Sequence, residues 1–466
     1  MENSVRKSPD FLEDSVIYQL FLRAFCKDRS LVSAAGLLPH IAGLGIDIVY
    51  LCPVVEHDDD ADPASWSPRQ KKSKIGNPKN PYRHKDFFKT DNEYGTDTDL
   101  KDFIRQAHRA GMRVMLDLVY MHCGPNATFL AEHPDYAQRD ERGQIITNAY
   151  NFPLINFDSE DLREYLWSNM EYFLREFDAD GYRCDTSDCV PLDFWEEGRR
   201  RMEQIKPYCI MLAEGHRKDD QQIAFDLNYA FPWKYGILKV LESQSSQTPT
   251  LPYLDEHSGE RKTARDLRAV WEKMNRDYPA GTRFVRNMDD HDITNDCYDL
   301  RHDHTFGVPA VDAALVVNLT LDGVPMLYNG QEIADISRHS IYANNCHAPT
   351  LHIDWSRALT STGQERLQHL KTLIKIRRAN PALTRGRVIW VDNNQPDAVL
   401  SFVRQCDEQA VTIVVNMSDQ PQNIDLVLTK KSIPHKTVLE RGAEFTLKHN
   451  HLGISLNPYG FLLITS

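Results

Sequence analysis

Short apolar runs alternate with longer amphipathic stretches from about residue 16 to residue 378, and this alternation limits the possible folds more than any other feature. A short, nearly continuous apolar run is typical of a strand buried on both faces, whereas the amphipathic stretches have the period of helices that cover a sheet. Eight strands are expected, most of them followed by a helix, over residues 16–20, 46–51, 113–117, 181–185, 209–214, 223–227, 282–287 and 323–328. This count predicts an α/β fold of the (β/α)8 TIM barrel type.

Two regions depart from the alternation. Residues 123–157 follow the third expected strand and are too many for a simple connection, so they predict a small inserted subdomain. From residue 384 onward, short β runs with turn residues between them predict a C-terminal antiparallel β-sandwich domain over 384–466. The catalytic barrel is then expected over 1–122 and 158–383. A second long polar loop spans residues 55–93, and long ordered loops are usually functional.

Charge and composition exclude several classes of partner. The formal net charge of −13 disfavours nucleic acid and anionic membranes, because both attract basic patches. No run of about 18 apolar residues is present, so no membrane span is expected. Residues 1–14 lack the apolar core of a signal peptide, and the nine cysteines contain no CxxC pair. These features predict a cytoplasmic protein with reduced thiols; the sequence leaves its oligomeric state open.

Carboxylates and histidines gather where several expected strands end. Strand three ends at Asp117 with His122 after it, strand four at Arg183 and Asp185, strand five at Glu214, and strand seven runs into residues 289–292. The carboxyl ends of parallel barrel strands face one side, where barrel enzymes keep their chemistry. Taken alone, the Arg183–Asp185 pair has the ordinary interpretation of a structural ion pair. Together, clustered carboxylates beside an arginine are typical of glycosidic-bond cleavage.

Four ordered motifs carry a family resemblance. Asp117–His122 (DLVYMH), Gly181–Asp185 (GYRCD), Ala213-Glu214 and His291-Asp292 resemble the four signature regions of the α-amylase family, glycoside hydrolase family thirteen. Further similar segments are 16–19, 44–53, 82–96 and 323–332, so that the resemblance covers roughly residues 15–380. It implies a barrel enzyme acting on carbohydrate, with the β domain in the expected place.

Residue by residue, the resemblance implies the following roles. Asp185 would be the nucleophile, Glu214 the general acid/base, and Asp292 the carboxylate that stabilises the transition state. The supporting residues would be Arg183, which orients Asp185; His122 and His291, which donate hydrogen bonds to sugar hydroxyls; Tyr82, which stacks on the sugar; and Asp117, which mainly supports loop packing. The product would keep its α configuration through a glycosyl-enzyme intermediate.

Several positions depart from the family pattern. Met121 replaces an asparagine that usually supplies oxygen to a structural calcium, and a thioether is a poor ligand for so hard a cation. Asp188-Cys189 replaces a usual Lys-His pair, which also alters the usual calcium site and the neighbouring sugar subsite. We therefore expect a degraded calcium site and assign no metal ligands and no certain cofactor; a structural calcium remains an alternative. Asp290 stands where asparagine is usual, which predicts a raised pKa for His291 or a different sugar contact.

The sequence therefore predicts a cytoplasmic, retaining α-glycosidase that acts on small α-glucans or maltooligosaccharides. A transglycosylase or isomerase of the same family, acting on trehalose or sucrose, has the same catalytic groups and remains an alternative. A non-catalytic carbohydrate-binding relative is a third possibility, and the presence of all three carboxylates argues against it.

Overall fold

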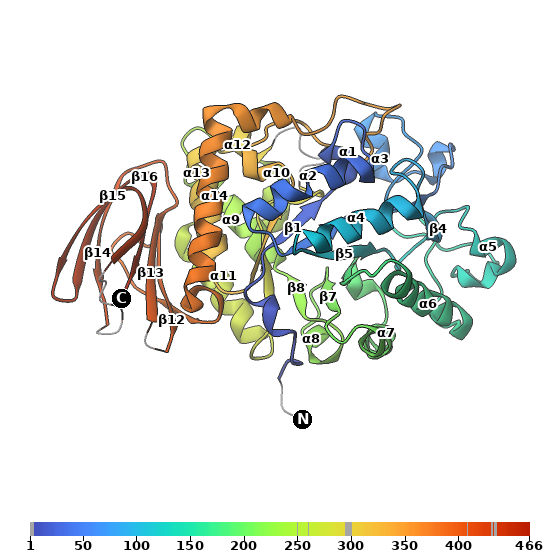
Figure 1. The fold of residues 1–466 in the computed structure, drawn as a ribbon, viewed down its shortest axis with the longest axis horizontal. Helices are drawn as coiled ribbons and strands as arrows, with labels where there is room; N and C mark the ends of the chain where they lie inside the picture. Colours follow the sequence, from blue (N-terminus) through green and yellow to red (C-terminus); the bar gives the residue numbers. More distant parts are fainter. Residues whose placement is uncertain are drawn as a thin grey trace.

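A closed barrel of eight parallel strands forms the centre of the molecule (Figure 1), in the order β1-β10-β9-β8-β7-β6-β5-β2. The computed structural model describes residues 4–248, 250–259, 261–293, 301–407, 409–429, 432 and 436–466. The barrel strands are β1 (Ile17–Leu20), β2 (Ile48–Leu51), β5 (Arg113–Leu118), β6 (Gly181–Cys184), β7 (Ile210–Ala213), β8 (Leu227–Tyr229), β9 (Phe284–Arg286) and β10 (Val324–Tyr328). The predicted (β/α)8 barrel is confirmed.

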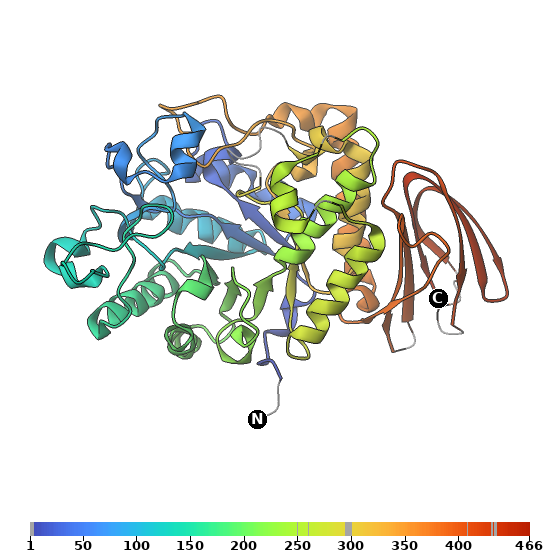
Figure 2. The same cartoon turned by 180° about the vertical axis from the view of Figure 1, so that it is seen from behind.

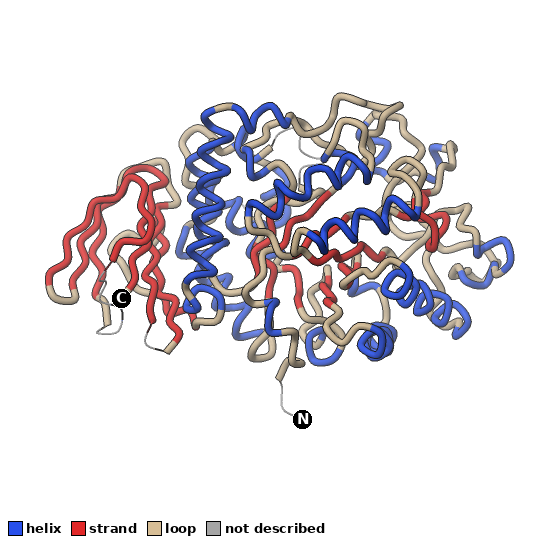
Figure 3. The backbone as a smooth tube through the Cα atoms, viewed as in Figure 1, coloured by secondary structure: helices blue, strands red, loops and turns tan. Residues whose placement is uncertain are grey.

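Helices surround this barrel, as Figures 2 and 3 show from opposite sides. The longer ones are α2 (Leu31–Leu44), α4 (Asp97–Arg109), α6 (Glu160–Glu176), α7 (Leu192–Ile205), α9 (Phe231–Ser243), α11 (Ala264–Asp277), α13 (Val308–Thr320) and α14 (Ser361–Ala379). Short helices lie in the connections: α1 (Leu22–Phe25), α3 (Pro68–Ser73), α5 (Phe129–Glu132), α8 (Asp220–Ile223), α10 (Pro252–Ser258), α12 (His302–Thr305) and α15 (Pro381–Thr384). Among the described helices, none is both long and apolar enough to cross a bilayer.

The strand expected over residues 223–227 was wrong. Ile223 ends the short helix α8, and the strand in this place is β8, which begins at Leu227. The apolar side chain of Ile223 is 51% exposed and packs into no core, so its hydrophobic character misled the assignment. A short apolar run does not distinguish a strand from a turn of helix.

Close contact between β6 and β7 depends on a glycine. A Cβ atom on Gly181 would lie 2.1 Å from the carbonyl oxygen of Ile210 on β7. Only a residue without a side chain allows this approach. Gly181 therefore fixes the register that brings the ends of β6 and β7 side by side, and with them Asp185 and Glu214.

The C-terminal domain is antiparallel β structure, as predicted. Its strands are β11 (Arg387–Trp390), β12 (Val399–Cys406), β13 (Gln409–Asn416), β14 (Gln422–Val427), β15 (Lys436–Lys448) and β16 (His451–Thr465), in the order β11-β12-β13-β16-β14 with β15 also paired to β16. One face of this sheet encloses its own apolar cluster, and the other packs on the barrel, mainly on α13. The domain lies at one end of the molecule (Figure 1).

The loops after β2 and β5 form the region above the barrel. A two-stranded antiparallel sheet, β3 (Val55–His57) with β4 (His84–Thr90), supports the loop after β2. Residues 123–157 contain α5 and several isolated bridges, such as Thr147 with Pro153. Both loops reach the carboxyl ends of the barrel strands.

Candidate active site

One arginine side chain joins three carboxylates at the carboxyl ends of β5, β6 and β7. Arg183 Nη1 donates to Asp117 Oδ1 and to Asp185 Oδ1, both at 2.8 Å. Its Nη2 lies 2.6 Å from Glu214 Oε2. The guanidinium is almost completely buried, and a buried ion pair of this kind holds its partners in fixed positions. The same-face placement predicted for Arg183 and Asp185 is confirmed, and Arg183 also bonds Glu214, which the sequence did not indicate.

Burial separates the pKa values of the two carboxyl groups that face the cavity. It raises the pKa of Asp185 to about 6, against the opposing charge of Arg183. Burial also raises the pKa of Glu214 to about 8. The positive charge of Arg183 acts to lower this pKa, and the negative charge of nearby Asp185 acts to raise it. At pH 7 Asp185 is therefore mostly ionised while Glu214 is mostly protonated. Two carboxyl groups with separated pKa values are the equipment for a nucleophile and an acid.

Thr186 connects these two carboxyl groups, although the sequence analysis missed it. Its backbone N–H donates to Glu214 Oε2 at 3.0 Å, and its hydroxyl donates to Asp185 Oδ2 at 3.2 Å. Its backbone has φ 39° and ψ 46°, a left-handed conformation that is unfavourable for a β-branched residue. The strained turn after β6 thus points two donors at the two acids.

A chain of hydrogen bonds runs from Gln19 on β1 to Asp117 on β5. Gln19 Nε2 donates to His291 Nδ1 at 2.7 Å, which leaves His291 Nε2 to donate to the Tyr82 hydroxyl at 2.6 Å. Tyr82 in turn donates to Asp117 Oδ2 at 3.1 Å. The rings of Tyr82 and His291 are stacked, with centroids 5.1 Å apart. Asp117 thus holds Tyr82 from below, as a supporting residue would.

The pKa of His291 is lowered and not raised, so this alternative from the sequence was wrong, although the charge of Asp290 does act to raise it. Burial lowers the pKa of His291 below its ordinary value. Asp290 bonds instead to the buried ammonium group of Lys234, at 2.6 Å. Its other oxygen accepts from the backbone N–H groups of Asp292 and Ile293, at 3.1 and 2.9 Å. The sequence could not indicate Lys234 as the partner because it lies 56 residues away.

His122 lies in the cavity wall, but both its ring nitrogens have protein partners. Nε2 donates to the backbone oxygen of Tyr82 at 2.7 Å, and Nδ1 accepts from Asn148 at 3.1 Å. Burial lowers its pKa to about 4, so the ring is neutral at pH 7. His122 therefore supports Tyr82 through its backbone oxygen. Its predicted bond to a sugar hydroxyl requires one of these contacts to be exchanged.

Asp292 is held by Arg69, a second residue that the sequence analysis missed. Arg69 Nη1 donates to Asp292 Oδ1 and Nη2 to the backbone oxygen of Asp292, each at 2.8 Å. Burial alone would raise the pKa of Asp292, but nearby His291, Arg69 and Lys234 lower it well below its ordinary range. Arg69 belongs to α3 in the loop after β2, 223 residues before its partner. The only signal in the sequence was the length of that loop.

These residues surround a cavity of about 530 Å³. Tyr82, His122, Asp185, Glu214, His291 and Asp292 all line it, whereas Asp117 and Arg183 lie beneath its floor. An aromatic wall from α9 and α10 completes it: Phe231, Tyr235, Tyr253 and His257. Their ring centroids lie 4.1–6.4 Å from their neighbours. Sugar rings present apolar faces to such walls, and hydroxyls to the polar groups of a site.

The residues around Met121 do not suit calcium. Met121 presents its thioether to the hydroxyl of Thr186, at 3.6 Å. The carboxylate of Asp188 accepts from the backbone N–H groups of His216 and Arg217, at 2.6 and 3.3 Å. A soft sulfur and a carboxylate already used within the protein do not make an oxygen cage. Within the described parts of the chain, no group of three or more His, Cys, Asp and Glu residues could hold a metal.

Chelation is therefore expected to leave the stability unchanged. Incubation with excess EDTA should not shift Tm in a calorimetric scan, and added calcium should not raise it. A bound ion at 100 times its Kd would contribute about 2.7 kcal/mol, which such a scan resolves easily. A fall of Tm in EDTA that calcium reverses would contradict the expected loss of the calcium site.

Two family models match the chain: the α-amylase catalytic domain over residues 35–148 and 144–351, and the maltogenic amylase C-terminal domain over residues 390–463. A cyclomaltodextrinase from Geobacillus thermopakistaniensis is 24% identical over 98% of this chain and 78% of its own. An intracellular maltogenic amylase from Bacillus subtilis is 22% identical over 99% of this chain and 78% of its own. A noncanonic maltogenic α-amylase from Thermotoga neapolitana has a similar fold, with TM-score 0.78 at 22% identity, over 98% of this chain and 99% of that one.

Proposed function

The chain belongs to the α-amylase family of glycoside hydrolases, and from this premise we propose that it cleaves α-glucosidic bonds in small α-glucans and maltooligosaccharides with retention of configuration. One observation supports this most strongly: a single guanidinium positions both Asp185 and Glu214, and burial gives them different protonation states at pH 7. The names of the relatives, a cyclomaltodextrinase and maltogenic amylases, support the class of substrate.

In the first half of the reaction, the ionised carboxylate of Asp185 attacks the anomeric carbon of the bound sugar. A bond forms between this carbon and a carboxylate oxygen as the glycosidic bond breaks, and Glu214 gives its proton to the departing oxygen. Asp292, ionised and held by Arg69, stabilises the positive charge that develops on the sugar ring. The stacked Tyr82 and His291 support that ring.

In the second half, Glu214 is ionised and acts as a base. It takes a proton from a water molecule, whose oxygen attacks the anomeric carbon and releases the carboxylate of Asp185. Two displacements at the same carbon restore the α configuration. Glu214 ends protonated and Asp185 ionised, so that both acids return to their starting states.

We also place the enzyme inside the cell. The described cysteines are all free thiols, and the Bacillus subtilis relative is named as intracellular. Both observations fit a reducing compartment and imported short substrates rather than raw starch.

A substrate panel tests the function. Maltose and maltotriose should be hydrolysed, and NMR of the first product should show the α anomer before mutarotation. Sucrose and trehalose should react at least about tenfold more slowly, since a site that fits one disaccharide binds a disaccharide with a different linkage less well. Isomaltose and starch complete the panel. A β product, or conversion of maltose or sucrose into an isomeric disaccharide, would contradict the proposal.

A further inference from the structure

Two loops meet above β1 and form one wall of the cavity. They follow β2 and β10, which flank β1 in the barrel, and they contribute residues 66–77, including α3, and residues 341–344. The Tyr342 hydroxyl lies 3.4 Å from Ser67 Oγ, and the Tyr342 backbone oxygen accepts from Asn77 Nδ2 at 2.8 Å. Gln70 on α3 donates to the backbone oxygen of Asn77 at 2.7 Å. We call these two segments together the α3 wall.

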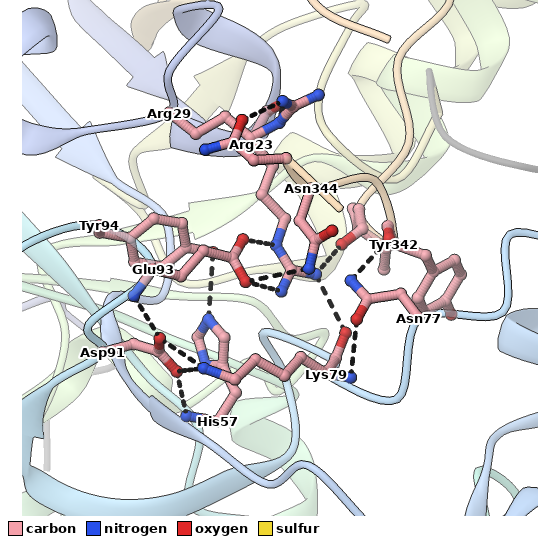
Figure 4. A network of polar contacts seen from close by, with 12 residues as sticks. Arg23, Arg29, His57, Asn77, Lys79, Asp91, Glu93, Tyr94, Tyr342 and Asn344 are labelled. Atoms are coloured by element: carbon pink, nitrogen blue, oxygen red, sulfur yellow. Dashed lines mark hydrogen bonds and ion pairs between the residues drawn. The ribbon is translucent and has the colours of Figure 1, made fainter. Parts of the chain in front are cut away.

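A buried arginine connects the two loops of the α3 wall, and Figure 4 shows its contacts with Glu93 and Lys79. Arg23 lies in α1, the short helix that comes after β1, and is completely buried. Its Nη1 donates to the backbone oxygens of Ile341 and Lys79, at 2.5 and 3.1 Å, one from each loop. The rest of its guanidinium bonds Glu93 at 2.7 and 3.0 Å. Separating the loops would leave a buried charge without its partners, which is costly.

The inserted residues 123–157 hold the α3 wall from its other side. Asn151 Nδ2 donates to the backbone oxygen of Trp66 at 2.8 Å, immediately before α3. Tyr150 and Phe152, on either side of Asn151, line the cavity. Three loops thus converge on α3, and Arg69 reaches from it to Asp292. No gap for a continuing chain is expected between segments that are bonded in this way.

The position of Glu214 decides which part of a substrate meets this wall. Glu214 follows β7, which lies four strands from β1 in either direction around the barrel and hence opposite the α3 wall. The leaving group departs on the side of its proton donor. The non-reducing part of the sugar bound over Asp185 therefore points away from Glu214, toward Arg69 and Tyr342.

We propose that the α3 wall, with Arg69 at its centre, stops the substrate at its non-reducing end, so that the enzyme acts on chain ends and does not open cyclic or internal glucans. This inference rests on the proposed hydrolase function and deepens it. The name of the cyclomaltodextrinase relative implies that this relative acts on cyclic glucans, whereas we expect the present chain not to open them. Arg69 acts as a specificity-determining residue that both orients Asp292 and occupies the space a longer chain would need.

Maltohexaose and cyclomaltohexaose form the matched pair of probes, because they contain the same sugars joined by the same kind of linkage, and only maltohexaose has chain ends. Initial rates would be measured for the purified full chain by release of reducing ends. The wild type should hydrolyse maltohexaose and open cyclomaltohexaose at less than about one hundredth of that rate. Arg69→Ala should raise the ratio of cyclic to linear rate about tenfold, even if it lowers both rates by disturbing Asp292.

Lys72→Ala is the control for Arg69→Ala, since it removes one positive charge from an exposed position of the same helix. The ratio of cyclic to linear rate for Lys72→Ala should equal that of the wild type. Asn77→Ala, which removes a bond between the two loops, is a second variant and should also raise the ratio.

Ready opening of cyclomaltohexaose by the wild type, with maltohexaose also cleaved, would overturn the inference and leave the proposed function standing. An unchanged ratio in both variants would overturn the role of the wall. Failure to cleave either probe would overturn the proposed function itself, and this inference with it.

Discussion

Replacing Asp185 by asparagine is expected to lower kcat on maltotriose by about 10⁴-fold or more, because it removes the carboxylate that forms the covalent intermediate. Asparagine has nearly the same shape and keeps an oxygen that can accept the bond from Arg183. The fold should therefore survive, and Tm should stay close to that of the wild type. Single-turnover kinetics with maltotriose, alongside a thermal scan, measure both quantities.

Two experiments distinguish a lost nucleophile from general damage. Asp193→Asn, at the exposed start of α7, also removes one carboxylate and should leave kcat unchanged. Asp185→Ala with added azide and an activated aryl α-glucoside should form the β-glucosyl azide, since a small anion then attacks from the vacated side. Retention of more than about a tenth of the activity by Asp185→Asn would refute the assignment of the nucleophile.

Glu214→Gln is expected to have the second-largest effect, and its size should depend on the leaving group. With maltotriose, whose leaving sugar needs a proton, activity should fall by about 10²–10⁴-fold. With an aryl glucoside of low leaving-group pKa, formation of the intermediate should be nearly unaffected. A burst of the phenol, followed by slow release of the sugar, would show that the missing base limits the second half.

The pH profile gives an independent view of the same two groups. For the wild type, kcat/KM should rise through a pKa of about 6 as Asp185 becomes ionised. It should fall through a pKa of about 8 as Glu214 loses the proton that it donates. Glu214→Gln should lack the alkaline limb, while Glu160→Gln at the exposed start of α6 should keep it. Equal losses on both leaving groups, or an alkaline limb that persists in Glu214→Gln, would rule out its acid role.

Much of the barrel could be predicted from the sequence, because strands buried on both faces produce continuous apolar runs such as residues 48–51. The spacing of Arg183 and Asp185 likewise determined that they share a face. The strand assignment failed near Ile223, because the apolar run there is too short to show the periodicity of either a strand or a helix. Local patterns decide local structure, and they are informative where the element is long or fully buried.

The missed parts of the site depend on contacts between distant segments. Arg69 meets Asp292 only because the loop after β2 and the loop after β9 converge at the cavity, and nothing in either local sequence indicates the other. The predicted rise in the pKa of His291 failed for the same reason, since distant segments bury its ring and this burial outweighs the charges of Asp292 and Asp290. The aromatic wall left a weak local signal, with Phe231 and Tyr235 four residues apart and hence on one face of a helix. That spacing alone is equally typical of a core helix.

The bonds of Arg183 leave an imbalance of charge in the free enzyme. At pH 7 its one positive charge faces the carboxylates of Asp117 and Asp185, while Glu214 is largely neutral. The floor of the cavity therefore has more negative than positive charge, and a neutral sugar does not balance it. As the glycosidic bond breaks, the ring acquires the charge of an oxocarbenium ion directly above these groups. The positive charge missing from the resting protein is thus the one that its substrate gains at the transition state.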